Sequence, residues 1–227
     1  MTDPEEYAHR LAAASLAAGD PTGWFEQLYA DADAGRTDVP WDRGTPNRLL
    51  VEWASTRQAG PGSADTADSH TGQARRAVVV GCGLGADAEF VAGLGYDTTA
   101  FDISATAVRS ARRRFPDTTV EYAVADLLHP PDAWRRAFDL VVESITVQSM
   151  PVHVRRQAIG GVAELVAHGG TLLVIARSRD AADEPDDGPP WLLTRADIDT
   201  FTDYDLHPVR IEHLKGRPGS WRAEFRR

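Results

Sequence analysis

Residues 78–87, VVVGCGLGAD, constrain the fold of this chain more than any other segment. A run of β-branched residues stops at three glycines in alternate positions, Gly81, Gly83 and Gly85, and an apolar helical pattern follows them. Glycine enters left-handed backbone conformations and lets the main chain approach another group closely. A strand, a tight turn and a helix in this order predict the first unit of a parallel sheet.

The chain after Ala77 alternates between strand and helix patterns, which predicts parallel strands with helices on both faces of the sheet. Strands are expected near residues 77–80, 98–102, 119–124, 138–143 and 170–176, and helices near 86–94, 104–114 and 152–167. Residues 206–214 and 221–226 predict an antiparallel pair at the sheet edge. The expected fold class is α/β: a Rossmann-like, mostly parallel sheet of seven strands with helices on both faces and an antiparallel C-terminal strand.

The first 75 residues carry helical patterns over residues 11–18, 24–30 and 48–57. Residues 58–73 are rich in Gly, Ser, Asp and Thr and lack large apolar side chains, which indicates a flexible connection. We therefore expect residues 1–75 to form a helical cap and a connection that belong to the same domain as the core, residues 76–227.

The 227-residue chain has 34 acidic residues against 24 Lys and Arg, a formal net charge of -10. That balance argues against a nucleic-acid partner, because a phosphate backbone needs a basic face. No segment has the length of a membrane span and the N-terminus lacks the pattern of a signal peptide, so a cytoplasmic protein without a membrane partner is expected. No group of His, Cys or carboxylate residues has zinc-site spacing, so no metal is predicted.

The glycine turn suits two classes of adenosine-containing ligand. It fits the dinucleotide fingerprint G-x-G-x-x-G/A, with Ala86 in the last position, and equally the G-x-G-x-G turn of S-adenosylmethionine enzymes. Asp102, at the end of the second strand, is placed to accept hydrogen bonds from two ribose hydroxyls. Asp126 ends the third strand, where it suits the adenine amino group. Together with the antiparallel C-terminal pair, Asp126 favours the sulfonium cofactor.

Three segments resemble class I S-adenosylmethionine-dependent methyltransferases: residues 81–87 (GCGLGAD), 94–97 (LGYD) and 101–108 (FDISATAV). More narrowly, the chain is similar to the thiopurine, halide and thiol methyltransferase-like branch, in which a GCGxGxD turn is followed by a strand ending in D-I-S. Residues 41–46 (WDRGTP) resemble the W-x-x-G-x-P segment of that branch, which lies over the cofactor. Val79 agrees with the apolar residue that the branch commonly has where most class I enzymes carry an acid.

The resemblance implies S-adenosyl-L-methionine as the cofactor and a small-molecule methyl acceptor as the partner. The residues implied in cofactor binding lie on the Trp segment, the glycine turn and the later strand ends: Trp41, Gly81, Cys82, Gly83, Gly85, Asp87, Asp102, Ile103, Ser104, Asp126, Leu127 and Glu143. Cys82 is the single cysteine of the chain. We expect it to be a small buried filler and not a nucleophile, because the ligand needs its backbone.

The implied function is methyl transfer to an S, O, N or halide nucleophile by in-line displacement, driven mainly by positioning. No catalytic residue is predicted beyond His153, the one candidate for a general base. A monomer or a homodimer is expected. Two other functions remain open at this point: a nicotinamide-dependent oxidoreductase, and a module that binds a cofactor without catalysis.

Overall fold

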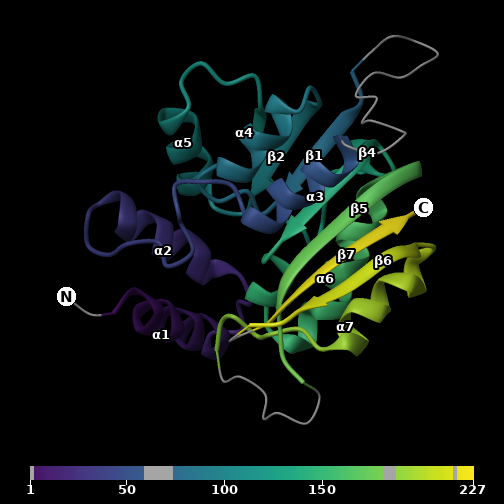
Figure 1. The fold of residues 1–227 in the computed structure, drawn as a ribbon. Helices are drawn as coiled ribbons and strands as arrows, with labels where there is room; N and C mark the ends of the chain where they lie inside the picture. Colours follow the sequence, from purple (N-terminus) through teal and green to yellow (C-terminus); the bar gives the residue numbers. More distant parts are fainter. Residues whose placement is uncertain (1–2, 59–73, 181–187, 217–218) are drawn as a thin grey trace.

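The computed structural model describes residues 3–58, 74–180, 188–216 and 219–227. One seven-stranded sheet runs through the molecule in the order β3-β2-β1-β4-β5-β7-β6 (Figure 1). The strands are β1 (Arg76–Val80), β2 (Asp97–Asp102), β3 (Glu121–Val124), β4 (Phe138–Ser144), β5 (Val166–Ser178), β6 (His207–Leu214) and β7 (Gly219–Arg226). The α-helices are α1 (Pro4–Ala17), α2 (Gly23–Asp33), α3 (Arg48–Gln58), α4 (Ala86–Gly93), α5 (Ala105–Arg114), α6 (Val152–Leu165) and α7 (Arg195–Asp199).

The directions of the strands confirm the predicted α/β class. Strands β1 to β5 pair in parallel, and β7 is antiparallel to both β5 and β6. The chain builds the sheet outward from β1, with β2 and β3 on one side and β4 and β5 on the other. In such open sheets the ligand crevice lies at the carboxyl ends of the strands where the order reverses, which here are β1 and β4.

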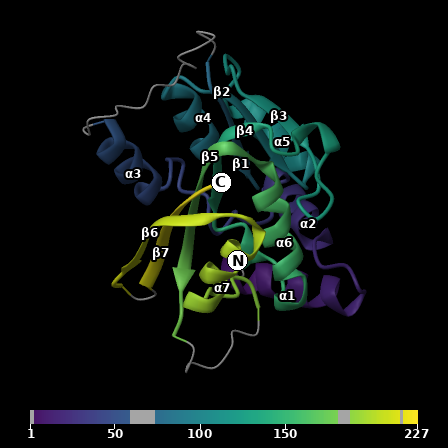
Figure 2. The same ribbon diagram turned by 90° about the vertical axis from the view of Figure 1, so that its right-hand side faces the viewer.

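Both faces of the sheet are buried, which explains why β1 is a continuous apolar run. Val78 and Val80 face the core under α6 and α7, whereas Ala77 and Val79 face the core under α3, α4 and α5. Figure 2 shows α3 and α6 on opposite sides of the sheet. Successive side chains of a strand point to opposite faces, so a strand buried on both sides has no polar alternation.

The element that differs most from expectation is β5. It begins at Val166 and not at residue 170, and α6 accordingly ends at Leu165. Val166 pairs with Phe138 before the register shifts along β4, and Gly169 in this stretch has a φ of 70°. A bulge therefore lets the strand start earlier than a glycine-containing sequence indicates.

The predicted flexible connection falls on residues 59–73, outside the described residues, apart from Gln58 at the end of α3. The three expected N-terminal helices are present as α1, α2 and α3. Across the described ranges, no helix combines the length and the apolar character that crossing a membrane requires.

The N-terminal helices α1 and α2 are fastened to the core by a carboxylate. Glu26 of α2 accepts hydrogen bonds from Ser104 Oγ (2.6 Å) and from the backbone N–H (3.1 Å) and Oγ1 (2.6 Å) of Thr106. These donors stand at the N-terminus of α5, where the helix dipole also favours a negative charge. Glu26 therefore fixes the helical cap against the start of α5.

We expect Glu26→Ala to lower the free energy of unfolding by on the order of 1 kcal/mol, because three hydrogen bonds to the start of α5 are lost. Urea unfolding measures the change. Asp203→Ala is the control, since Asp203 pairs only with Arg156 among the ion pairs of the described residues, both side chains are exposed, and its removal should cost about 0.5 kcal/mol or less. Equal losses in the two variants would contradict a fastening role for Glu26.

Candidate functional site

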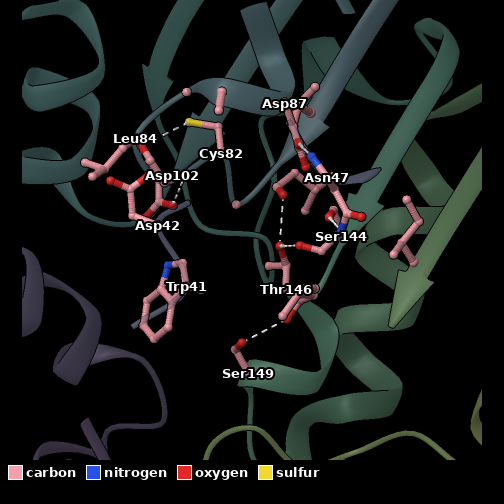
Figure 3. Close-up of a pocket in the computed structure, with 18 of the residues that line it drawn as sticks. Trp41, Asp42, Asn47, Cys82, Leu84, Asp87, Asp102, Ser144, Thr146 and Ser149 are labelled. Carbon is pink, nitrogen blue, oxygen red and sulfur yellow. Dashed lines mark hydrogen bonds between the residues drawn. The ribbon is translucent and has the colours of Figure 1, made fainter. Parts of the chain in front are cut away.

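A cavity of about 270 Å³ opens at the carboxyl ends of the central strands, where the sheet order reverses. Its walls come from α2, the segment before α3, the glycine turn and the strand ends, and they include Tyr29, Trp41, Asn47, Cys82, Asp102, Thr146 and Arg177. Figure 3 shows Asp102 on one side of this space and Asn47, Asp87 and Ser144 on the other. The cavity lies at the place that the sheet topology predicts for a ligand.

The glycine turn forms one wall of the cavity with its backbone. Gly81, Gly83 and Gly85 have φ angles of 59°, 52° and 92°, a region that other residues rarely adopt. A Cβ on Gly83 would also lie 2.8 Å from the hydroxyl oxygen of Tyr29, and one on Gly81 would overlap the side chain of Thr146. Both the backbone conformation and the close packing of Tyr29 and Thr146 against the turn therefore require glycine at Gly81 and Gly83, and the turn lines the cavity.

Asp102 ends β2 beside this turn and is buried. Its Oδ2 accepts a hydrogen bond from the backbone N–H of Gly83 and its Oδ1 accepts one from that of Ser104, each at 2.9 Å. A carboxylate has about four acceptor positions, so two remain for a ligand. Burial raises the pKa of Asp102 to about 6 and the charge of Glu26 adds to the rise, while neighbouring backbone N–H groups, those of Ser104 and Gly83 foremost, counteract it. The group is ionised at neutral pH.

The next strand end carries the second predicted acid. Asp126 lines the cavity after β3, accepts a hydrogen bond from the N–H of Leu128 (2.8 Å) and pairs with His129 Nδ1 (2.9 Å). Leu127 and Ile103 line the same end of the cavity. This end thus combines an apolar wall with one carboxylate.

A polar cluster on the opposite side joins three elements. The backbone N–H of Asn47 donates to Asp87 Oδ1 (2.6 Å), and Asn47 Nδ2 donates to Ser144 Oγ (3.1 Å). Burial raises the pKa of Asp87. The cluster links the start of α3, the start of α4 and the end of β4, and all three residues line the cavity (Figure 3). Sequence reasoning identified Asp87 but missed Asn47 and Ser144, although Asn47 stands just before a helical pattern.

Two aromatic residues pack beside Gly83 at the cavity wall. Trp41 Nε1 donates a hydrogen bond to the hydroxyl oxygen of Tyr29 (3.0 Å), and the rings meet edge to face with centroids 6.1 Å apart. Trp24 also meets Trp41 edge to face, with ring centroids 6.0 Å apart. The predicted Trp segment therefore lies at the cavity, and α2 contributes Tyr29 to it.

The turn after β4 is backbone-strained. Ile145 has a φ of 68°, which is unusual for a β-branched residue. Its N–H donates to the carbonyl of Ile175 (2.8 Å), and its carbonyl accepts a hydrogen bond from Ser149 Oγ (2.8 Å). Thr146 Oγ1 donates to the carbonyl of Val80 (2.9 Å). These contacts hold the turn against β1 and β5 and keep the hydroxyl of Thr146 at the cavity wall.

Three predicted site residues do not line the cavity. The hydroxyl of Ser104 accepts from the N–H of Ala107 and donates to Glu26, so it caps α5. Glu143 points to the α6 face because side chains alternate along β4, and it accepts a hydrogen bond from the N–H of Val147 (2.9 Å). His153 is exposed on α6. The imidazole is therefore not positioned to act as a base in this cavity.

Cys82 lies between two of the glycines, and its thiol is buried. Burial raises the pKa of the Cys82 thiol well above its ordinary range, and the nearby charge of Asp102 adds to the rise. A protonated thiol is a poor nucleophile. The geometry agrees with the expected role as a small filler.

The segment that contains the glycine turn, Asp102 and Asp126 matches a known protein family. Residues 77–170 match the sequence profile of a family described as a methyltransferase domain. This segment of the chain is therefore similar to a methyltransferase domain. The matched segment spans β1 to the start of β5, including the glycine turn, Asp102 and Asp126. The match decides between the two enzyme classes that the glycine turn left open and confirms the predicted S-adenosylmethionine-dependent methyltransferase.

Several solved structures share the fold of this methyltransferase. An N-methyltransferase NodS from Bradyrhizobium japonicum in complex with S-adenosylhomocysteine has 22% identity, covers 88% of this chain and 97% of its own, and superposes with a TM-score of 0.63. A 1,6-didemethyltoxoflavin-N1-methyltransferase from Burkholderia thailandensis, with bound 1,6-didemethyltoxoflavin and S-adenosylhomocysteine, has 14% identity, 100% and 91% coverage and a TM-score of 0.63.

A third structure comes from work on the conversion of a disulfide bond into a thioacetal group during echinomycin biosynthesis. It has 20% identity to this methyltransferase, covers 89% of this chain and 93% of its own, and has a TM-score of 0.65. No curated protein sequence matches the chain. At these identities the structural likeness establishes the fold.

Glu143 makes the stability of this methyltransferase depend on pH. Burial raises the pKa of Glu143 from 4.5 to about 7, so its favourable contribution is complete below pH 4.5 and is lost as the pH rises through 7. We expect the free energy of unfolding of the wild type, relative to Glu143→Gln, to fall by on the order of 3 kcal/mol between these limits. Urea unfolding of both proteins at several pH values measures it. A constant difference would contradict the buried, titrating carboxyl.

Proposed function

We propose that this methyltransferase transfers the methyl group of S-adenosylmethionine to a small-molecule nucleophile in the cavity at the end of β1 and β4. The observation that carries the proposal is the buried carboxylate of Asp102, which keeps free acceptor positions at the cavity, beside the glycine turn that lines the same cavity. Two structures of the same fold hold S-adenosylhomocysteine, which supports the same occupant here.

The donor would lie across the strand ends in the order of the sheet. Asp102 would accept hydrogen bonds from the ribose hydroxyls, and Asp126, Leu127 and Ile103 would hold the adenine beyond β2. The backbone of Gly81–Gly85 would contact the middle of the cofactor. Asp87 and Trp41 would border its methionine end from opposite sides.

A bound sulfonium supplies an already activated methyl group, so the protein needs to supply position and a shielded site. Trp41 and Tyr29, which pack edge to face beside the glycine turn, would shield a bound cofactor from water. Among the described residues that line the cavity there is no histidine, and the hydroxyls of Thr146 and Ser149 already donate to backbone carbonyls. The site therefore suits a nucleophile that needs no imidazole base, such as a thiolate.

The segment that contains Trp41 supports kinship with the thiopurine, halide and thiol methyltransferase-like branch. Residues 41–46 resemble the W-x-x-G-x-P segment of that branch, and Trp41, Asp42, Arg43 and Thr45 line the cavity. A thiol or halide acceptor is accordingly favoured over a phenol or an amine, whose attack generally requires removal of a proton.

Transfer from S-adenosylmethionine with a tritiated methyl group, offered to a panel of thiols, halides, phenols and amines, tests the activity. We expect labelled product with thiols or halides. Isothermal titration with S-adenosylhomocysteine and with NAD(H) accompanies the assay. Tight binding of S-adenosylhomocysteine with no transfer to any acceptor would favour a module without catalysis. Binding of NAD(H) alone would overturn the proposal.

We expect Asp102→Asn to weaken the binding of S-adenosylhomocysteine by about tenfold or more, because hydrogen bonds to a charged acceptor are lost. In the wild type the affinity should also fall as the pH drops through about 6, where Asp102 takes up a proton. Isothermal titration between pH 5 and 8 measures both effects. Asp117→Asn removes an exposed acid from the loop after α5 and should leave the affinity unchanged. Unaltered binding in Asp102→Asn would refute the ribose role.

A further inference from the structure

One part of the cavity wall lies beyond β4 and has no partner in the proposed donor site. This part is formed by Ile175 and Arg177 of β5, Ser220 of β7, Leu49 of α3, and Met150, which lies between β4 and α6. Three of these five residues are apolar. Arg177 brings a permanent positive charge to this wall.

The strand register fixes the side of the sheet on which Arg177 lies. Ile175 and Arg177 are two positions apart on β5, so their side chains point to the same face. Ile175 packs in the core cluster that contains Leu49 of α3, and Arg177 pairs in register with Ser220 of β7. Arg177 thus stands at the carboxyl end of β5, on the face covered by α3.

The electrostatic surroundings set Arg177 apart from the other charged residues of the wall, which are Asp42, Arg43, Arg48, Asp87, Asp102 and Asp126. Arg48 forms an ion pair with Glu52, and both Arg43 and Arg48 are exposed. Arg177 is half-buried. The ion pairs among the residues that the structure describes include none made by Arg177.

The order of the strands separates Arg177 from the proposed donor site. Asp102 ends β2, and β1 and β4 lie between β2 and β5. Neighbouring strands are about 4.8 Å apart, so the two strand ends are separated by roughly 14 Å. A donor whose ribose is at Asp102 and whose middle part lies on Gly81–Gly85 therefore reaches β1 and β4. The part of the cavity wall on β5 therefore lies beyond the methyl group of the donor, where the methyl acceptor would bind.

We propose that Arg177 binds a carboxylate of the methyl acceptor. The inference rests on the proposed function, because it assigns the far wall to the second substrate. The guanidinium of arginine matches a carboxylate with two parallel hydrogen bonds. The acceptor is then a small molecule with an apolar body against Ile175, Met150 and Leu49 and a carboxylate at Arg177.

The charge balance of the cavity favours a carboxylate over a phosphate. Four aspartates line the cavity, namely Asp42, Asp87, Asp102 and Asp126, against three arginines, Arg43, Arg48 and Arg177, so the acids still outnumber the bases and disfavour a second negative charge. A singly charged group is balanced by one guanidinium, whereas a phosphate monoester carries close to two charges at neutral pH.

Isothermal titration of the S-adenosylhomocysteine complex with benzoate and phenylacetate, and with benzamide and phenylacetamide as neutral counterparts, tests the proposal. We expect the wild type to bind the carboxylates about tenfold more tightly than the amides, and Arg177→Gln to lose that preference. Arg177→Lys should keep part of the preference for carboxylates, because lysine keeps the positive charge but cannot donate two parallel hydrogen bonds. Arg210→Gln removes one positive charge from β6, outside the cavity, and should behave as the wild type.

Three results with the S-adenosylhomocysteine complex would overturn the assignment. Absence of carboxylate binding in the wild type, or an equal preference in Arg177→Gln, would place the anion elsewhere. A tenfold loss of affinity for S-adenosylhomocysteine itself in Arg177→Gln would assign the arginine to the donor. If S-adenosylhomocysteine does not bind the wild type, the proposed function fails on its own. The same titrations of the free protein then still decide whether Arg177 binds carboxylates.

Discussion

The carboxylate of Asp102 holds the two backbone segments around which the cavity is arranged. It accepts one hydrogen bond from Gly83 in the glycine turn and one from Ser104 at the start of α5. Burial disfavours this charge, and the backbone N–H groups stabilise it. The position of the glycine turn therefore depends on the buried carboxylate of Asp102. A ligand that donates further hydrogen bonds to this carboxylate would stabilise its charge in the same way as the backbone N–H groups do.

The helical cap, which is distant in the sequence, is connected to the cavity through Ser104. Ser104 donates its backbone N–H to Asp102 and its hydroxyl to Glu26 of α2. One turn further along α2, Tyr29 accepts the hydrogen bond of Trp41 over the glycine turn. The helical cap is thus tied to the end of β2 on one side and forms the wall of the cavity on the other. Ser104 thus connects the carboxylate proposed to bind the ligand, Asp102, with the carboxylate that holds the cap, Glu26.

The sequence predicted the features whose signal is local. The β-branched run before Gly81 indicates β1, and the acids that follow the next strands predict the cavity edge. Alternation along β4 sends Glu143 to the α6 face, and a shift of one residue in the predicted orientation is enough to misplace it. Asn47, Ser144 and Arg177 come together only through strand order and helix packing, so no short pattern indicates them. The early start of β5 likewise depends on its pairing with β4.

Ile145 shows what the cavity requires of the backbone. A glycine would relax its φ of 68°, but the branched side chain that lines the cavity would then be missing. The turn keeps its conformation because the carbonyl of Ile175 and the hydroxyl of Ser149 hold it from both sides. The shape of the cavity at this point is therefore a property of the paired strands β4 and β5. Any fraying of that pairing would release the turn and withdraw the side chain, so sheet integrity and cavity shape change together.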